Sequence, residues 1–565
     1  MRKTWGLLSI GAAIILAGCL LAHWTQTTGG IRIQDVRFTG SNATPMSALL
    51  YVPSNATTKT PAPGILAVHG YINSRETQSA FAIEYARRGY VVLSLDQTGH
   101  GYSGGFAFGN GFGGPDGLKY LRSLDFVDRE NIGLEGHSMG GGSILAAAQA
   151  YPNDYKSMVL EGSATGTLFS PKAAPNFPRN VAVVFSQYDE FSQLMWSVAR
   201  AKDVAGSEKL KGLFGTEEDV ATQKLYGSID AGTARVLYTP ATTHPGDHIS
   251  FEAVGDSLDW FAKTLVGAKP MERDDQVWHW KEIGTGVALV GFALLLLGAF
   301  ELLISRQHFA PLRQSPQAAS VRRDARWWGS LALTAFVPVL SYYYFFGLGG
   351  QWMPASKYFP QSITNQIVVW ALLNGAITLV LGRLLVKSKG ESRSQWLLSL
   401  QIALATVGIG YLSLVLADYF FKVDFRFWVV ALKVLAPERF GQFLAYLIPF
   451  TVFFLIAFRA LHGFLFVNGD SRAKHYWSGV TATAFGFLCF IVINYVPLFA
   501  VGHLLIPAQA LNAIVSIQFL PLMAILGLVA VFTWRRTNNY VPGALIAGLF
   551  VTWYVVAGTA VQFRG

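Results

Sequence analysis

The sequence predicts two regions of different fold class: an α/β domain with a mostly parallel eight-stranded sheet flanked by helices, then an all-α transmembrane bundle of about eight helices. Only 14% of the 565 residues are charged, against roughly 25% in an ordinary soluble domain. Charge is absent from long segments, for example between His475 and Trp534, and about 20 apolar residues suffice for a spanning helix. Residues 30–270, in contrast, have ordinary charge content and alternate β-rich runs with helical patterns, which predicts crossover connections and a parallel sheet.

The N-terminal segment, residues 1–29, contains an apolar run from 5 to 22 after a basic start. This composition is typical of a signal peptide or a signal-anchor. Residues 16–19 read Leu-Ala-Gly-Cys and resemble a bacterial lipobox, in which cleavage before the cysteine leaves a lipidated N-terminus. The apolar run continues beyond Cys19, which favours an uncleaved anchor. With Cys489 as the one other cysteine, neither a disulfide framework nor a cysteine zinc site is predicted.

Residues 30–270 form the predicted α/β domain. Helical patterns occupy Thr77–Arg88 and Ser138–Ala150. The expected strands are Ile31–Phe38, Ser47–Val52, Gly64–Val68, Val91–Asp96, Ile132–Leu134, Ser157–Glu161, Val181–Phe185 and Arg235–Tyr238.

Residues 271–565 form the predicted polytopic membrane domain. The expected spans are 283–304, 328–347, 364–386, 396–418, 441–463, 477–499, 512–534 and 541–560. Between two of them, Phe425–Leu435 is expected to be a short interfacial helix with basic residues near lipid headgroups. Three amides inside spans, Asn374, Gln401 and Asn494, are typical of interhelical hydrogen bonds. No charged residue is expected at mid-span, so no ion path is predicted.

The net charge of +10 resides in short loops, which argues against a nucleic-acid partner and instead sets the orientation in the membrane. A cytoplasmic N-terminus places the loops at 306–326, 387–393, 470–474 and 535–536 inside, and each of them carries at least two Lys or Arg residues. The opposite side holds fewer, namely Lys357, Lys422, Arg426, Lys433, Arg439 and Arg564. We therefore expect a multi-pass protein of a bacterial cell membrane, with the α/β domain outside the cytoplasm.

A G-x-S-x-G pentapeptide, residues 136–140, follows the apolar strand at 132–134 and precedes a Gly- and Ala-rich helical run. In this strand–turn–helix setting the pattern predicts a nucleophile elbow, where small residues let strand and helix approach and a strained turn exposes the Ser138 hydroxyl. A Gly-rich turn without catalytic function is the alternative.

Two further segments carry a family resemblance. Residues 65–71 read Ile-Leu-Ala-Val-His-Gly-Tyr, and residues 89–96 form a strand that leads into Gly99-His-Gly-Tyr-Ser-Gly-Gly105. With the elbow, in this order and spacing, they resemble the α/β-hydrolase family over roughly residues 45–265. The nearest resemblance is to dienelactone-hydrolase and prolyl-oligopeptidase-like esterases and peptidases.

The resemblance implies a Ser–acid–His triad in chain order and an oxyanion hole made of two backbone N–H groups. The donors would be Met139, after the nucleophile, and Tyr71, after His-Gly. The histidines His69, His100 and His137 precede the position of the family's acid, so they are expected to shape loops.

The same resemblance places the acid in the loop after the strand at 181–185, where Asp189 matches. Glu190 beside it and Glu161 after the preceding strand are the alternatives. The base should lie just before the last helix of the domain, which favours His248 over His244. Two histidines four residues apart are also seen among metal ligands, but Pro and Gly between them make a turn and no third ligand is evident.

These patterns predict a membrane-tethered serine hydrolase that acts on a small-molecule or lipid-like ester, thioester or amide, with Ser138, Asp189 and His248 as its triad and with membrane lipids around its spans. Such a site needs no cofactor and no metal. The rival hypotheses are a transporter or membrane-complex subunit with a hydrolase-like binding domain, and an acyltransferase that uses a membrane-bound acceptor.

Overall fold

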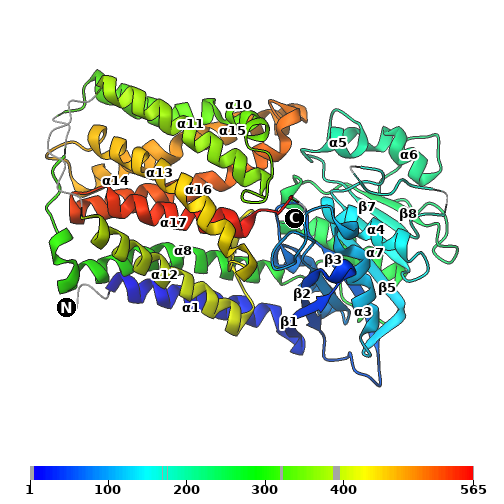
Figure 1. Ribbon diagram of the computed structural model, residues 1–565. Coiled ribbons are helices and arrows are strands. Elements are labelled where there is room, and N and C mark those ends of the chain that lie inside the picture. The colour runs from blue at the N-terminus through cyan, green and yellow to red at the C-terminus, as the bar shows by residue number, and fades with distance from the viewer. Residues whose placement is uncertain (1–5, 168, 175, 319–321, 386–394, 564–565) are drawn as a thin grey trace.

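The computed structural model describes residues 6–563 except 168, 175, 319–321 and 386–394. Figure 1 shows a bundle of long helices beside a domain built on a central sheet, with the first helix, α1, running the length of the bundle to reach the sheet domain. The predicted loop at 387–393 and the predicted outer residue Arg564 lie outside the described residues.

The central sheet has eight strands in the order β1-β2-β4-β3-β5-β6-β7-β8. β1 pairs antiparallel with β2, β2 pairs antiparallel with β4, and the remaining pairs are parallel. This confirms the predicted fold class. The strands are β1 (Arg32–Thr39), β2 (Pro45–Val52), β3 (Ala62–Val68), β4 (Val91–Leu95), β5 (Val127–His137), β6 (Ser157–Glu161), β7 (Val181–Val184) and β8 (Arg235–Tyr238).

Helices cover both faces of the sheet. Successive side chains of a strand therefore pack alternately into two separate hydrophobic cores, one on each face. In β3, Leu66 packs on the face that carries α3 and α4, whereas Ile65 packs on the face that carries α2 and α7. A strand that is buried on both faces has a continuous run of apolar residues, and such runs predict the positions of these strands in the sequence. The helices are α2 (Ser79–Arg87), α3 (Gly114–Ser123), α4 (Met139–Ala150), α5 (Ser192–Trp196), α6 (Glu208–Phe214) and α7 (Phe251–Thr264).

The bundle contains the predicted apolar spans. Among the described residues, eight helices, α1 included, are long and apolar enough to cross a membrane, and a ninth span results if the α9–α10 pair, bent by 51°, is counted as one. The helices are α1 (Gly6–Gln26), α8 (Trp278–Ile304), α9 (Ala325–Leu340), α10 (Tyr342–Trp352), α11 (Ser362–Leu385), α12 (Trp396–Phe421), α13 (Phe440–Phe464), α14 (Arg472–Val480), α15 (Gly486–Val501), α16 (Ala510–Thr537) and α17 (Val541–Gly558).

The amides predicted inside spans do make bonds between elements. Asn374 of α11 donates to Ser341, at the bend between α9 and α10. Asn494 of α15 accepts the Tyr343 hydroxyl of α10 at 2.8 Å. Gln401 of α12 bonds the ring of His308. Asn374 and Asn494 therefore link helices of the bundle, as expected, whereas Gln401 links α12 to the 3-10 segment Gln307–Leu312.

The first helix, α1, packs along α8 through glycines spaced seven residues apart. A Cβ atom on Gly18 would lie 2.4 Å from the carbonyl oxygen of Gly284, and one on Gly11 would lie 2.5 Å from the backbone nitrogen of Leu295. Small residues at such a seam let two helix backbones approach closely, which supplies packing energy inside a bilayer. Cys19, the lipobox cysteine, is buried in the middle of α1.

The predicted interfacial helix at Phe425–Leu435 is wrong. The segment is a β-hairpin, β9 (Phe425–Phe427) and β10 (Val430–Leu432). Arg426 does not reach toward headgroups: its guanidinium is buried and bonds Asp424 and the Thr77 hydroxyl of the sheet domain. The hairpin therefore docks the bundle onto the sheet domain. This contact joins residues far apart in the sequence, so the local sequence pattern does not predict it.

Candidate active site

Ser138 lies at the sharp turn between β5 and α4. Its backbone has φ 55° and ψ −118°, a left-handed conformation that costs free energy for a side chain other than glycine. The flanking glycines allow the turn: a Cβ atom on Gly140 would lie 2.0 Å from the carbonyl oxygen of Val68, and one on Gly136 would lie 2.3 Å from that of Gly140. The geometry is that of the predicted nucleophile elbow.

His244 lines the same cavity and is paired with a carboxyl group behind it. His244 Nδ1 lies 2.7 Å from Asp189 Oδ2. Asp189 also accepts the backbone N–H of Phe191 at 2.7 Å; burial raises the pKa of this carboxyl, and the Phe191 bond opposes that shift. Burial lowers the pKa of His244 to about 4. The imidazole is therefore neutral at pH 7, and with Nδ1 bound to Asp189 its Nε2 is free to accept a proton.

His248, which the sequence analysis favours as the base, does not contact Asp189. Neither of its ring nitrogens has a hydrogen-bond partner among the described residues, and its ring packs on His137 with centroids 4.1 Å apart. The reason is a bridge between Tyr188 and Thr243. Because this bridge pairs the loop after β7 with the loop after β8, the next residue of each, Asp189 and His244, become neighbours.

His248 lies about one turn further on, in the 3-10 segment Pro245–Ile249. The geometry therefore favours His244 as the base. Among the described residues, no group of three or more His, Cys, Asp or Glu side chains is arranged to hold a metal ion.

The two alternative acids are placed differently from Asp189. Glu161, at the end of β6, is fully buried and neither of its carboxyl oxygens has a hydrogen-bond partner in the described structure; burial raises its pKa well above the usual range. Glu190 accepts the backbone N–H of His244 at 2.8 Å and the hydroxyl of Tyr495, from α15, at 2.9 Å. Burial raises the pKa of Glu190 to about 8. Glu190 thus supports the histidine backbone and links it to the bundle.

The three upstream histidines hold backbone segments, as expected. His69 accepts the N–H of Gln97 at 3.2 Å, and His100 accepts the N–H of Ile72 at 3.3 Å. His137 bonds the carbonyl oxygen of His244 at 2.9 Å through Nε2. Each ring therefore fixes a loop of the site.

The two predicted oxyanion donors both line the cavity next to Ser138. Met139 is the first residue of α4, where a backbone N–H has no partner within the helix. Tyr71 follows Gly70, whose position brings β3 close to the nucleophile: a Cβ atom there would lie 3.1 Å from Ser138 Cβ. The Tyr71 hydroxyl accepts a bond from Gln562 in the C-terminal segment.

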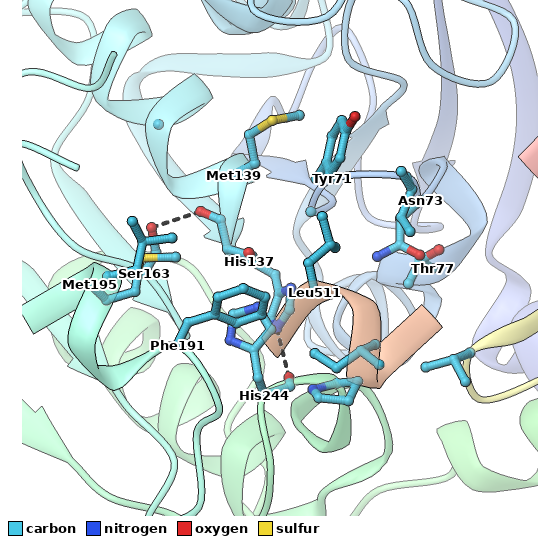
Figure 2. Close-up of a pocket in the computed structure, with 18 of the residues that line it drawn as sticks. Tyr71, Asn73, Thr77, His137, Met139, Ser163, Phe191, Met195, His244 and Leu511 are labelled. Atoms are coloured by element: carbon cyan, nitrogen blue, oxygen red, sulfur yellow. Dashed lines mark hydrogen bonds between the residues drawn. The ribbon is translucent and has the colours of Figure 1, made fainter. Parts of the chain in front are cut away.

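The cavity has a volume of about 440 Å³, within the range of small-molecule sites. One wall belongs to the sheet domain and contains Ser138 and His244. The opposite wall belongs to the bundle, and Figure 2 shows Leu511 of α16 extending between Tyr71 and Phe191. The bundle's part of the lining comprises Ser362, Ile363, Gln366, Trp428, Val429, Leu511, Ile514, Gln518 and Gln562. The sequence gives no local signal for this wall, because its residues come from four distant segments.

Comparisons with known proteins find similarity in the part of the chain that carries the sheet. Residues 59–190 match the family described as serine aminopeptidase, S33. A monoacylglycerol lipase of Mycolicibacterium smegmatis is 32% identical over 115 residues, 18% of this chain and 37% of that protein. The quorum-quenching protein AidA of Acinetobacter baumannii is 34% identical over 129 residues, 20% of this chain and 38% of that protein.

The chain thus spans less than two fifths of the length of these two relatives. Among solved structures, an esterase of Pyrococcus furiosus is 17% identical and covers 43% of this chain and 94% of its own, with a TM-score of 0.31. The part of the chain that carries the sheet is thus similar in sequence to α/β hydrolases over residues 59–190, and it is continuous in one polypeptide with a bundle of apolar helices.

Proposed function

We propose that this protein is a membrane-tethered serine hydrolase that cleaves an ester, thioester or amide through an acyl-Ser138 intermediate, with His244 as base and Asp189 as its partner. The observation that carries the proposal is the 2.7 Å contact between His244 Nδ1 and Asp189 Oδ2, in the same cavity as the strained Ser138. This contact matters because the carboxylate holds the imidazole in the orientation that lets Nε2 take the serine proton, and it stabilises the imidazolium that forms.

In the acylation step, the neutral His244 takes the proton of the Ser138 hydroxyl through Nε2 while Oγ attacks the substrate carbonyl carbon. The carbonyl oxygen becomes an oxyanion, which the backbone N–H groups of Met139 and Tyr71 would stabilise. The imidazolium formed on His244 is stabilised by the Asp189 carboxylate. When the tetrahedral intermediate collapses, His244 gives its proton to the leaving oxygen, sulfur or nitrogen, and the acyl group stays on Ser138.

In the deacylation step, His244 takes a proton from a water molecule, and the resulting hydroxide attacks the acyl carbon. The Ser138–acyl bond then breaks, Oγ regains a proton from His244, and the carboxylic acid leaves. The same groups serve both steps, so the reaction requires only water as a co-reactant.

The test of this chemistry is covalent labelling with a fluorophosphonate probe in membranes that contain the full chain. We expect labelling of the unsubstituted protein and none of Ser138→Ala. The matched control is Ser54→Ala, at an exposed serine on the surface of the sheet domain, which should label fully. Equal labelling of Ser138→Ala would overturn the assignment of the nucleophile.

We further propose that the hydrolase domain lies outside the cytoplasm. The basic loops favour this orientation, and Figure 1 supports it, since the start of α1 lies at the end of the bundle away from the sheet. Single cysteines at the exposed positions Ser54 and Ser315, in a background without Cys19 and Cys489, can be probed with an impermeant maleimide on intact cells. We expect Ser54→Cys to react and Ser315→Cys to react only after lysis; the reverse pattern would invert the orientation.

A further inference from the structure

The active-site cavity does not end at its bundle wall. A second cavity of about 60 Å³ lies between α11, α16, α17 and the β9–β10 hairpin. It shares six lining residues with the active-site cavity, so the two meet at that wall. The shared residues are Ile72, Asn73, Ile363, Trp428, Val429 and Gln518.

A third cavity, of about 120 Å³, continues deeper into the bundle among α9, α11, α13 and α16. It meets the second cavity at Met523 and Leu526, which line both. Residues of α16 therefore line all three spaces, from Leu511 beside the active site to Leu526 at the far end.

The distance along α16 matches a lipid chain. Fifteen residues of helix rise about 22 Å at about 1.5 Å per residue. One acyl chain of a bilayer lipid spans a single leaflet, about half of the ~30 Å hydrocarbon core. The row from Leu511 to Leu526 is thus long enough to lie beside a complete long acyl chain whose carboxyl carbon is at Ser138.

The chemistry of the lining also matches. No Lys, Arg, Asp or Glu lines the third cavity. Three of its hydroxyls are bonded to helix carbonyl groups: Thr334 to Ser330, Thr378 to Asn374, and Thr483 to Met523. The amide of Asn374, which also lines it, donates to the Trp370 carbonyl oxygen and to the Ser341 hydroxyl. Hydroxyls bonded in this way present mainly hydrocarbon to the space, which favours an apolar occupant over water.

The two cations of the second cavity are Arg426 and Lys433. Arg426 is held by Asp424 and by hydroxyls of the sheet domain. Lys433, like Arg426, belongs to the hairpin region that docks onto the sheet domain. Both therefore come from the hydrolase end of the path, and the apolar cavity lies beyond them.

We propose that the three cavities form one acyl-chain path, and that the substrate class is a lipid-like ester, thioester or amide whose long acyl chain enters the bundle while its carbonyl reaches Ser138. This proposal rests on the proposed function, since it names the substrate of that site. It gives the bundle a role beyond anchoring. The membrane helices would select substrates by the length of the acyl chain, and the sheet domain would hydrolyse the bond at the carbonyl carbon.

The kinetic test uses the purified full-length protein in nanodiscs and p-nitrophenyl acetate, butyrate, laurate and palmitate. The substitution Met523→Trp fills the junction between the second and third cavities. We expect it to lower the ratio of the palmitate to the acetate kcat/KM at least tenfold. The matched control Leu416→Trp, at an exposed position of α12, should leave the ratio unchanged. A ratio unchanged in Met523→Trp would overturn the path.

A second measurement does not depend on turnover or on a bulky substitution. Palmitate with a terminal diazirine is bound to Ser138→Ala and activated by light, and the attached peptides are identified. We expect attachment to residues of the third cavity on α16 and α13. Attachment confined to the sheet domain would overturn the path. Cross-links in the bundle without labelling of Ser138 by the fluorophosphonate probe would leave the acyl site standing and refute the proposed hydrolysis.

Discussion

The two walls of the active-site cavity differ in chemistry. The sheet-domain wall holds the titratable groups, with Ser138 and His244 in the cavity and Asp189 behind them. The bundle wall offers apolar side chains such as Leu511 and Ile514, together with a few amides and a serine hydroxyl, and none of its residues is charged. Under the proposed function, bond cleavage and substrate selection are divided between the two regions. Substitutions on the first wall should lower kcat, and those on the second should change selectivity.

The largest effect should come from the base on the sheet-domain wall. His244→Ala removes the group that takes the serine proton, so kcat for p-nitrophenyl butyrate should fall by about 10⁴-fold or more. His248→Ala is the matched comparison: its ring has no hydrogen-bond partner among the described residues, and the rate should stay within about tenfold of the parent. If His248→Ala were inactive and His244→Ala active, the base would have to be reassigned.

Much of the architecture of both regions follows from the sequence. The strands were predictable because a strand buried on both faces is a short, continuous apolar run, and β6 begins and ends at the predicted residues. The spans were predictable because the bilayer core tolerates few charges. The elbow was predictable because close packing demands glycine at particular places, as at Gly136 and Gly140.

What the sequence could not predict depends on contacts between distant segments. The contact of Asp189 with His244 and not with His248 depends on the bridge between Tyr188 and Thr243, which is a tertiary contact. The hairpin at Phe425–Leu432 has an apolar, aromatic composition that suits an interfacial helix as well as strands, and docking onto the sheet domain decides between them. The bundle wall of the cavity likewise exists only after the two regions meet.

The second prediction tests whether the bundle is a packed scaffold. Gly284→Leu would force a side chain against α1, because even a Cβ atom would lie 2.7 Å from the carbonyl oxygen of Gly18. We expect a loss of about 1–3 kcal/mol in the free energy of unfolding, typical of overpacking, measured as a lower melting temperature in detergent. Gly408→Leu on α12 is the matched control, since nothing lies within 4 Å of its Cβ position. Equal stability of the two variants would show that α1 does not pack on α8.

The third prediction is a pH profile of the sheet-domain wall. His244 acts as a base only when neutral, so kcat/KM should fall as the pH drops through its pKa. Because burial lowers that pKa to about 4, activity on a short ester should change little between pH 7 and about pH 5.5 and should fall to about half near pH 4. An ordinary histidine would give an acid limb near pH 6.5, and that result would mean that the imidazole is solvated in the working enzyme.

The smallest effect should come from a contact between the two regions that reaches the loop of His244. Tyr495 of α15 donates its hydroxyl to Glu190, whose other oxygen accepts the backbone N–H of His244. Tyr495→Phe leaves a buried carboxyl with one partner fewer. A hydrogen bond of this kind contributes about 1 kcal/mol, so kcat should fall about fivefold while KM changes little.

The matched control for this contact is Tyr343→Phe, which removes a hydroxyl bonded to Asn494 within the bundle and should leave kcat unchanged. If both variants lowered kcat equally, the loss would reflect a general loosening of the bundle. If only Tyr495→Phe did, the hydroxyl acts as a positioning group through Glu190. This contact would then join the bundle to the loop of the proposed base, beside the bond from the Trp428 indole N–H to the carbonyl oxygen of Pro245.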